Sequence, residues 1–160
     1  MSRSSIPLPV RVTLLGVLSG ARSFTPLATL ALYRGRRSLR GSWQGWPVFR
    51  SSAARTALVL GALGELVGDK LPATPSRTTP LPLLGRIVTG AIAGAALGTT
   101  GGSRAVRSAA LLGAVGAVVG SFAGRYLRAG GAATGIPDAV FALIEDAATV
   151  ACAAAVVAAD

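Results

Sequence analysis

Long apolar runs, separated by clusters of arginine, proline or glycine, dominate this sequence of 160 residues. A helix needs roughly 18–25 apolar residues to cross the hydrocarbon core of a bilayer, and five runs approach that length. The sequence therefore predicts an all-α, polytopic membrane helix bundle of about five transmembrane helices. The predicted spans are about 12–33, 53–71, 83–99, 104–128 and 137–159, in a single membrane domain that covers residues 1–160.

The composition favours the same interpretation. Hydrophobic residues make up 51% of the chain and charged residues only 14%, whereas soluble domains carry about 25% charged residues. Glycine contributes 21 residues and aromatic residues only 5%, a balance that is typical of closely packed membrane helices. We therefore expect small residues at the helix contacts.

Several classes of site are excluded by residue counts. The chain has no histidine and one cysteine, so His/Cys metal clusters, disulfide frameworks and histidine-dependent triads cannot form. Cys152 stands in an Ala/Val run and is expected to be a small buried residue. We expect no cofactor.

The net charge of +10 would suit a nucleic-acid partner. The arginines, however, are spread between the apolar runs, as in membrane loops that lie beside anionic headgroups. We therefore expect a bilayer with anionic headgroups as partner, and no nucleic acid.

The first apolar run is interrupted near its middle. Arg22 and Pro26 fall inside it, and the stretch 20–26 is expected to be a broken or kinked part of one transmembrane helix. A signal peptide is the alternative; a twin-arginine signal is disfavoured because Arg36 and Arg37 follow the run.

The connection 34–52 is the longest polar stretch and holds both tryptophans, Trp43 and Trp46, among five arginines. Indoles and arginines together are typical of a loop or short amphipathic helix at headgroup level. The positive-inside rule then places this loop in the cytoplasm. The same rule places the N-terminus outside and Asp160 inside.

Glycines recur at a spacing that lets two helix backbones approach closely. We expect these positions to pack helices and, because five short spans enclose little volume, to support a homo-oligomer. The predicted packing residues are Gly90, Gly94, Gly113, Gly116, Gly120 and Gly124.

Ionisable residues inside or near the apolar runs are the candidate site, because such groups are costly in lipid and mark ion or solute paths. Glu65 and Asp69 share one helix face, since they are four residues apart. The candidate ion- or solute-binding residues are Glu65, Asp69, Glu145 and Asp146, and the candidate counter-charges are Arg22, Lys70, Arg86 and Arg125.

Two interpretations of these charges stay open. They either line a path for an ion, a proton or a small polar solute, with Glu65 as the principal group, or form a buried ion-pair network that fixes helix register. The first predicts a transporter or channel, the second a non-catalytic scaffold or lipid-binding helper subunit. An enzyme is not expected, although paired carboxylates could hold Mg²⁺ on a lipid phosphate.

An internal repeat is also suggested by short matches, 14–24 with 111–122 and 62–65 with 142–145. If the repeat is real, the first two spans correspond to the last two in inverted orientation, as in many carriers.

The element Glu65-Leu-Val-Gly-Asp-Lys-Leu-Pro72, followed by Arg86, a small-residue third helix and the late Glu145–Asp146, resembles the bacterial domain-of-unknown-function 4126 family of small membrane proteins. The resemblance covers most of the chain. It implies a multi-pass protein of the bacterial cytoplasmic (inner) membrane and brings no activity with it. The long Arg/Trp connection departs from the short one usual in that family.

Overall fold

The computed structural model describes residues 6–68, 78–132 and 137–159, and the described chain is mostly helical and without strands. This confirms the predicted all-α class. The α-helices are α1 (Leu8–Ala21), α2 (Thr25–Leu32), α3 (Pro47–Arg50), α4 (Ser52–Gly68), α5 (Pro80–Gly98), α6 (Ala105–Ala132) and α7 (Asp138–Ala158). Short 3₁₀ turns occur at Arg37–Leu39 (η1), Ser42–Gly45 (η2) and Thr99–Gly101 (η3).

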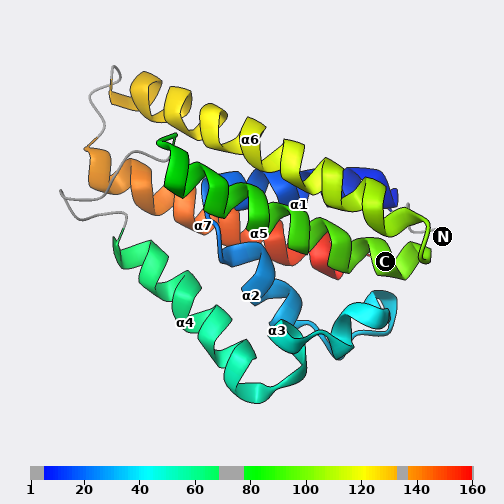
Figure 1. Cartoon of the computed structure of the whole chain (residues 1–160). Helices are drawn as coiled ribbons and strands as arrows, with labels where there is room; N and C mark the ends of the chain where they lie inside the picture. Colours follow the sequence, from blue (N-terminus) through cyan, green and yellow to red (C-terminus); the bar gives the residue numbers. More distant parts are fainter. Residues whose placement is uncertain (1–5, 69–77, 133–136, 160) are drawn as a thin grey trace, which may run out of the picture.

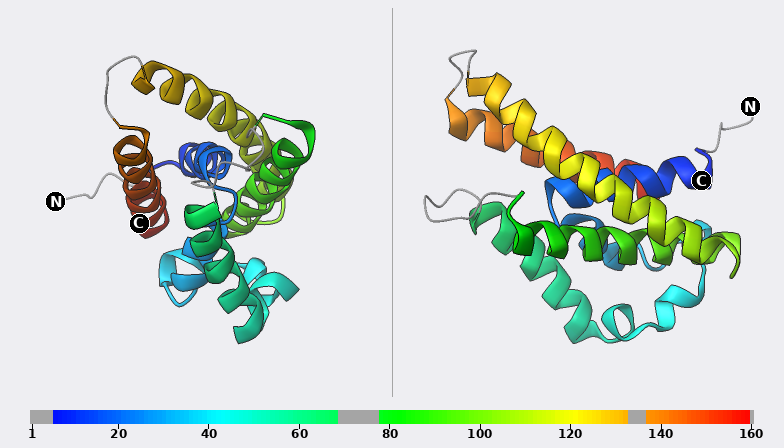
Figure 2. Two further views of the ribbon diagram at one scale, coloured as in Figure 1. Left: turned by 90° about the vertical axis from the view of Figure 1, so that its left-hand side faces the viewer. Right: turned by 45° about the horizontal axis from the view of Figure 1, so that its top comes forward.

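Three described helices are long and apolar enough to cross a membrane. They cover Pro80–Gly101, Ala105–Leu127 and Val140–Ala158, and Leu8–Ala21 is a shorter apolar helix. The count of about five transmembrane helices is therefore not confirmed. Helix α1 lies between α5, α6 and α7, which surround it in the end-on view (Figure 2).

The run expected to form one interrupted span folds as a helical hairpin. Helix α1 ends at Ala21, α2 begins at Thr25, and α2 turns back beside α4 and α7 (Figure 1). The expected interruption near Arg22 is thus present, but the chain reverses there instead of continuing in one direction.

The start of α1 and the end of α2 both lie near the C-terminal end of α7. Arg11, near the start of α1, donates to the Val156 carbonyl at 3.0 Å. Arg36, just after α2, donates to the Ala158 carbonyl at 2.7 Å. Residues 8 and 36 therefore lie at the same end of α7. A single membrane crossing between the N-terminus and the Arg/Trp connection would put residues 8 and 36 at opposite ends of the bundle, and they lie at the same end. Asp160 lies outside the described residues.

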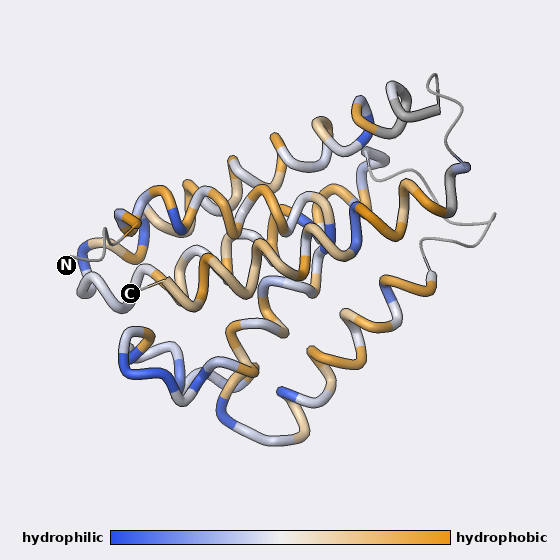
Figure 3. The backbone as a smooth tube through the Cα atoms, turned by 180° about the vertical axis from the view of Figure 1, so that it is seen from behind, coloured by the Kyte–Doolittle hydropathy of each residue, from blue (hydrophilic) through white to orange (hydrophobic). Residues whose placement is uncertain are grey.

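This end of the bundle is also the basic end. Gly41 lies against Thr99, and Gly101 lies against Leu8, so the connection after α2 and the turn between α5 and α6 gather there. The hydrophilic segments of the tube between α2 and α3 lie at the same end (Figure 3). The arginines of these connections are Arg34, Arg36, Arg37, Arg40 and Arg104, and Arg107 lies in the first turn of α6.

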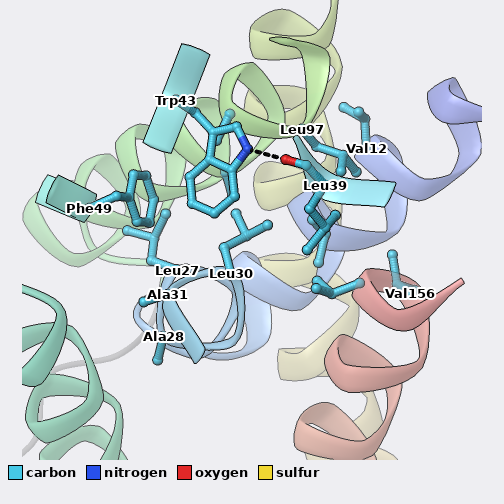
Figure 4. Packing of buried hydrophobic residues seen from close by; sticks show 14 of the residues in the cluster. Val12, Leu27, Ala28, Leu30, Ala31, Leu39, Trp43, Phe49, Leu97 and Val156 are labelled. Atoms are coloured by element: carbon cyan, nitrogen blue, oxygen red, sulfur yellow. Dashed lines mark hydrogen bonds between the residues drawn. The ribbon is translucent and has the colours of Figure 1, made fainter. Parts of the chain in front are cut away.

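The Arg/Trp connection is folded onto the protein. Trp43 is fully buried, donates its indole N–H to the Leu39 carbonyl at 2.7 Å, and meets the Phe49 ring edge-to-face at 4.8 Å (Figure 4). The expectation of two indoles at headgroup level is wrong for Trp43, because its ring fills the core between α2 and α5. Trp46 is only half-buried, and Arg37 and Arg40 are exposed.

The glycines predicted to pack helices lie at contacts inside the chain. Gly113 faces Gly90 and Gly94 across the antiparallel α5–α6 pair, and Gly116 and Gly120 face α1. A methyl group placed on Gly90 would lie 2.6 Å from the Gly113 carbonyl oxygen, so the two backbones are in direct contact. These faces are occupied within one chain and leave the homo-oligomer a proposal.

The two units of the suggested internal repeat do not share a fold. Residues 8–32 form two helices that reverse, whereas 105–132 form one continuous helix. The local sequence matches fall on α1 and α6, which instead run parallel and in contact, with Gly16 against Gly113 and Gly20 against Ala117.

Gly113→Ala should lower the melting temperature, because overpacking of a backbone contact costs about 1–3 kcal/mol. Gly85→Ala is the matched control: Gly85 is also inside a helix but has open space where its side chain would be. Alanine there gains up to about 1 kcal/mol of helix propensity. Thermal unfolding in detergent would contradict the described contact if both variants behaved alike.

Candidate functional site

The tip of the α1–α2 hairpin, residues 22–24, is the feature around which the charged residues gather. Pro26 lies in the first turn of α2, where its missing N–H costs nothing, so a new helix can start after the break. The last carbonyls of α1 and the first N–H groups of α2 have no partners within their own helices. In a low-dielectric interior each such group costs free energy unless another element supplies a partner.

Arg86, from the second turn of α5, supplies the partner for α1. Its guanidinium donates to the carbonyls of Gly20 at 2.7 Å and Ala21 at 2.8 Å, and the side chain is only 6% exposed. A cation at the C-terminal end of a helix also interacts favourably with the helix dipole. The Ser121 hydroxyl on α6 donates to the Ala117 carbonyl of its own helix at 2.8 Å and also lies 3.3 Å from the Gly20 carbonyl oxygen.

Glu65, near the end of α4, supplies the partner for the two residues just before α2, of which Phe24 is the N-cap. Its Oε1 accepts from the Ser23 N–H at 2.7 Å, and its Oε2 accepts from the Phe24 N–H at 3.0 Å. A carboxylate at the N-terminal end of a helix has the favourable sign for the dipole. Glu65 also pairs with Arg86 at 3.6 Å, so the two caps attract each other.

Arg22 occupies the break itself and is fully buried. Its Nη2 donates to Asp146 Oδ1 on α7, and its Nη1 donates to the Glu65 backbone carbonyl at 3.4 Å. This ion pair ties the hairpin tip to the wall formed by α7. Arg22, Glu65, Arg86 and Asp146, here named the tip cluster, bring together two arginines and two carboxylates from four parts of the chain.

The tip cluster lies at membrane depth if the bundle spans a bilayer. Helix α1 has 14 residues, which rise about 21 Å from the basic end, against a hydrocarbon thickness of about 30 Å. The formal charges of the cluster sum to zero. Pairing of this kind is required there, because an isolated charge in lipid is costly.

The other candidate residues lie apart from the tip cluster. Glu145 precedes Asp146 on α7 but lines a groove between α1, α6 and α7, where it is half-buried. Arg125 is exposed on α6 and donates to the Thr78 hydroxyl at 3.2 Å. Asp69 and Lys70 lie outside the described residues. Gly124 is buried on α6 and lines the same groove as Glu145.

The expectation that Cys152 is buried is wrong. It is exposed, not buried, and lies on the groove face of α7 beyond Thr149. The Ala/Val run gave no sign of this, because an apolar helix between protein and lipid is apolar on every side. Within the described parts of the chain, no group of three His, Cys, Asp or Glu residues is placed to hold a metal ion.

Sequence reasoning missed two arginines that hold the hairpin. Arg11 is 7% exposed and, with Arg36, binds the terminal carbonyls of α7. The hairpin therefore contacts α7 at two places: Arg11 and Arg36 bind the end of α7, and Arg22 at the hairpin tip binds Asp146. The sequence did carry a signal, because Arg11 lies one turn into an apolar helix. A buried arginine there needs acceptors such as the carbonyls at a helix C-terminus.

Comparison with family models, with curated proteins and with solved structures finds no match to this chain. The function is therefore argued from the geometry alone.

Asp146→Asn should be strongly destabilising, by about 3–5 kcal/mol, because it leaves the buried Arg22 without its charged partner. In a double-mutant cycle, Arg22→Gln with Asp146→Asn should cost less than the sum of the single changes by about 0.5–3 kcal/mol.

The control cycle pairs Asp146→Asn with Arg11→Gln. Arg11 contacts the same helix about ten residues, or about 15 Å, farther along, so these effects should add within about 0.5 kcal/mol. Equal coupling in both cycles, measured by chemical unfolding, would contradict a specific Arg22–Asp146 pair.

Proposed function

We propose that this chain is a multi-pass protein of the bacterial cytoplasmic membrane that moves a proton, an ion or a small polar solute across the bilayer. The observation that carries the proposal is the tip cluster, in which two carboxylates and two arginines meet at a helix break. Broken helices at membrane depth, with ionisable groups at the break, are a recurring arrangement in carriers.

The chemistry of the cluster gives protonation a structural consequence. Glu65 holds the N–H groups of Ser23 and Phe24, just before α2, and also pairs with Arg86, which holds the last carbonyls of α1. A protonated Glu65 loses its ionic attraction to Arg86 and becomes a weaker acceptor for the Ser23 and Phe24 N–H groups. Loading Glu65 with a proton, or with a cation that competes with Arg86, would then loosen both limbs of the hairpin together.

The basic end fits the cytoplasmic face by the positive-inside rule. With the hairpin geometry, we then expect the start of α1 and the end of α7 on the cytoplasmic side. Arginines such as Arg37 and Arg40 would meet anionic headgroups there. We also propose that the chain assembles as a homo-oligomer, because one copy presents large exposed apolar side chains on α4, such as Leu60 and Val67.

A second candidate is a scaffold or lipid-binding helper subunit without transport activity. The tip cluster also favours this candidate, because its carboxylates already accept hydrogen bonds from backbone N–H groups or from an arginine. A purely structural network needs the same pairing. No enzymatic role is proposed.

Flux and stability measured on one sample separate the two candidates. Wild-type proteoliposomes under an imposed pH gradient should show flux above protein-free liposomes, and Glu65→Gln should abolish it. Glu65→Gln should also lower the melting temperature, because Arg86 loses its ionic partner. Glu65→Gln combined with Arg86→Gln removes both charges, and should recover part of the stability without recovering flux.

Arg125→Gln is the matched control, since this arginine is exposed and away from the break. It should leave flux and melting temperature unchanged. Wild-type flux at the background level would favour the scaffold. Flux that survives in the double variant would show that the tip cluster is not the coupling site.

A further inference from the structure

A hollow of about 500 Å³ lies at the basic end, where the connection after α2 meets the turn between α5 and α6 (Figure 1). This hollow, here named the turn pocket, is lined by Ser42, Thr99, Ser103, Val106 and Arg107. Hydroxyl and guanidinium groups thus make up most of its wall. Its volume lies within the range of small-molecule sites, about 300–1,000 Å³.

The donors of the turn pocket are available to a ligand. Arg107 is exposed and makes no hydrogen bond or ion pair with the described residues. The hydroxyls of Ser42 and Ser103 likewise make no hydrogen bond within the described parts of the chain. Thr99 donates its hydroxyl proton to the Ala96 carbonyl at 2.8 Å and therefore serves as wall. The pocket offers one guanidinium and two hydroxyl donors.

The described carboxylates do not balance the positive charge of this end. Glu65 and Asp146 belong to the tip cluster, and Glu145 precedes Asp146 on α7. Asp138 begins α7, whose other end lies at the basic end. A cluster of arginines without nearby carboxylates attracts a ligand with a net negative charge more strongly than a zwitterion.

An exposed apolar stripe begins on α6 one turn beyond Arg107. Leu111 and Val115 are 68% and 61% exposed, and they follow Arg107 at intervals of four residues, which places them on one side of the helix. The segment Ala105–Leu127 is long and apolar enough to cross a membrane, so Arg107 lies at one end of it. An anionic head and an apolar tail on one ligand would match the pocket and the stripe together.

We propose that the turn pocket binds the phosphate group of an anionic phospholipid. The Arg107 guanidinium and the two serine hydroxyls donate to the phosphate oxygens, because the planar guanidinium fork matches two such oxygens at once. An acyl chain lies along Leu111 and Val115. The lipid assignment rests on the membrane placement in the proposed function, and it does not depend on transport. It differs from general attraction to headgroups because it requires particular donors.

Binding is tested with the full chain in detergent micelles, titrated with fluorescent phosphatidylglycerol and with phosphatidylcholine that carries the same acyl chains and fluorophore. The wild type should prefer phosphatidylglycerol, because only this lipid has a net negative charge. Arg107→Gln should weaken phosphatidylglycerol affinity by about tenfold or more, since it removes a charge-assisted phosphate contact.

Arg37→Gln is the matched control. Arg37 is also exposed at the basic end but does not line the pocket, so this variant removes the same charge from the same end. It should change the affinity by less than about threefold, because exposed charges at a distance are screened. Equal losses in the two arginine variants would show attraction by surface charge alone and would overturn the proposal.

The serines are tested without a change of net charge. Ser42→Ala combined with Ser103→Ala should weaken phosphatidylglycerol binding by about threefold or more. Ser108→Ala should not, because Ser108 lies outside the pocket and donates to the Ala105 carbonyl at 3.0 Å. Thermal unfolding checks that each variant is folded. Unchanged affinity in the folded double variant would contradict the assigned donors.

Inorganic phosphate separates a lipid headgroup from a free phosphate. Leu111→Ser should weaken phosphatidylglycerol binding and leave competition by inorganic phosphate unchanged. Leu143→Ser, on a similarly exposed leucine of α7, should weaken neither. Inorganic phosphate that binds as tightly as the lipid, with no effect of Leu111→Ser on either, would identify a soluble phosphate ligand and overturn the lipid assignment.

A carboxylate of the chain itself is the remaining occupant to test. Asp160 lies outside the described residues, and a gain of about tenfold in phosphatidylglycerol affinity in Asp160→Asn would show that it competes for Arg107. That result would overturn the proposal, and an unchanged affinity supports it.

Flux distinguishes failure of this proposal from failure of the proposed function. Phosphatidylglycerol binding that depends on Arg107, without flux of any tested ion, supports the lipid site and contradicts transport. Proton flux that depends on Glu65, without a preference for phosphatidylglycerol, supports transport and overturns the lipid site.

Discussion

The interaction on which the fold depends is the pairing of Glu65 with Arg86 across the break between α1 and α2. A reversed chain inside a bundle leaves carbonyls at the end of one helix and N–H groups at the start of the next. Arg86 binds the carbonyls, and Glu65 binds the N–H groups of Ser23 and Phe24 immediately before α2, each with the sign that the helix dipole favours. The contact between the two caps then ties α4 and α5 to the same point.

This constraint explains why the hairpin can sit in the middle of the bundle. Glycines on α6 allow α1 to approach its backbone, and Arg11 and Arg36 attach the base of the hairpin to the end of α7. Arg22 attaches its tip to Asp146. The hairpin is thus held by charged groups at both levels and by close backbone packing between them. A change of charge at the tip would be felt by α4, α5 and α7 together.

The sequence predicted the helical class, the interruption near Arg22 and the ionisable residues that meet there, because composition and apolar run length are local properties. It did not predict the reversal of the chain. Arg22 and Pro26 break a helix whether the chain then continues or turns back, and long-range contacts such as that of Arg36 with α7 distinguish these outcomes. Likewise, nothing local separates Asp146, which meets Arg22, from Glu145, which lines the groove one position earlier.

Site-specific labelling in intact membranes tests the hairpin most directly. In a Cys152→Ala background, Ile6→Cys and Ser38→Cys flank the hairpin, and Thr79→Cys lies beyond α4 at the start of α5. A membrane-impermeant maleimide should label positions 6 and 38 from the same face of the bilayer, and position 79 from the opposite face. Labelling of positions 6 and 38 from opposite faces would show that residues 8–32 cross the membrane once, and would contradict the account.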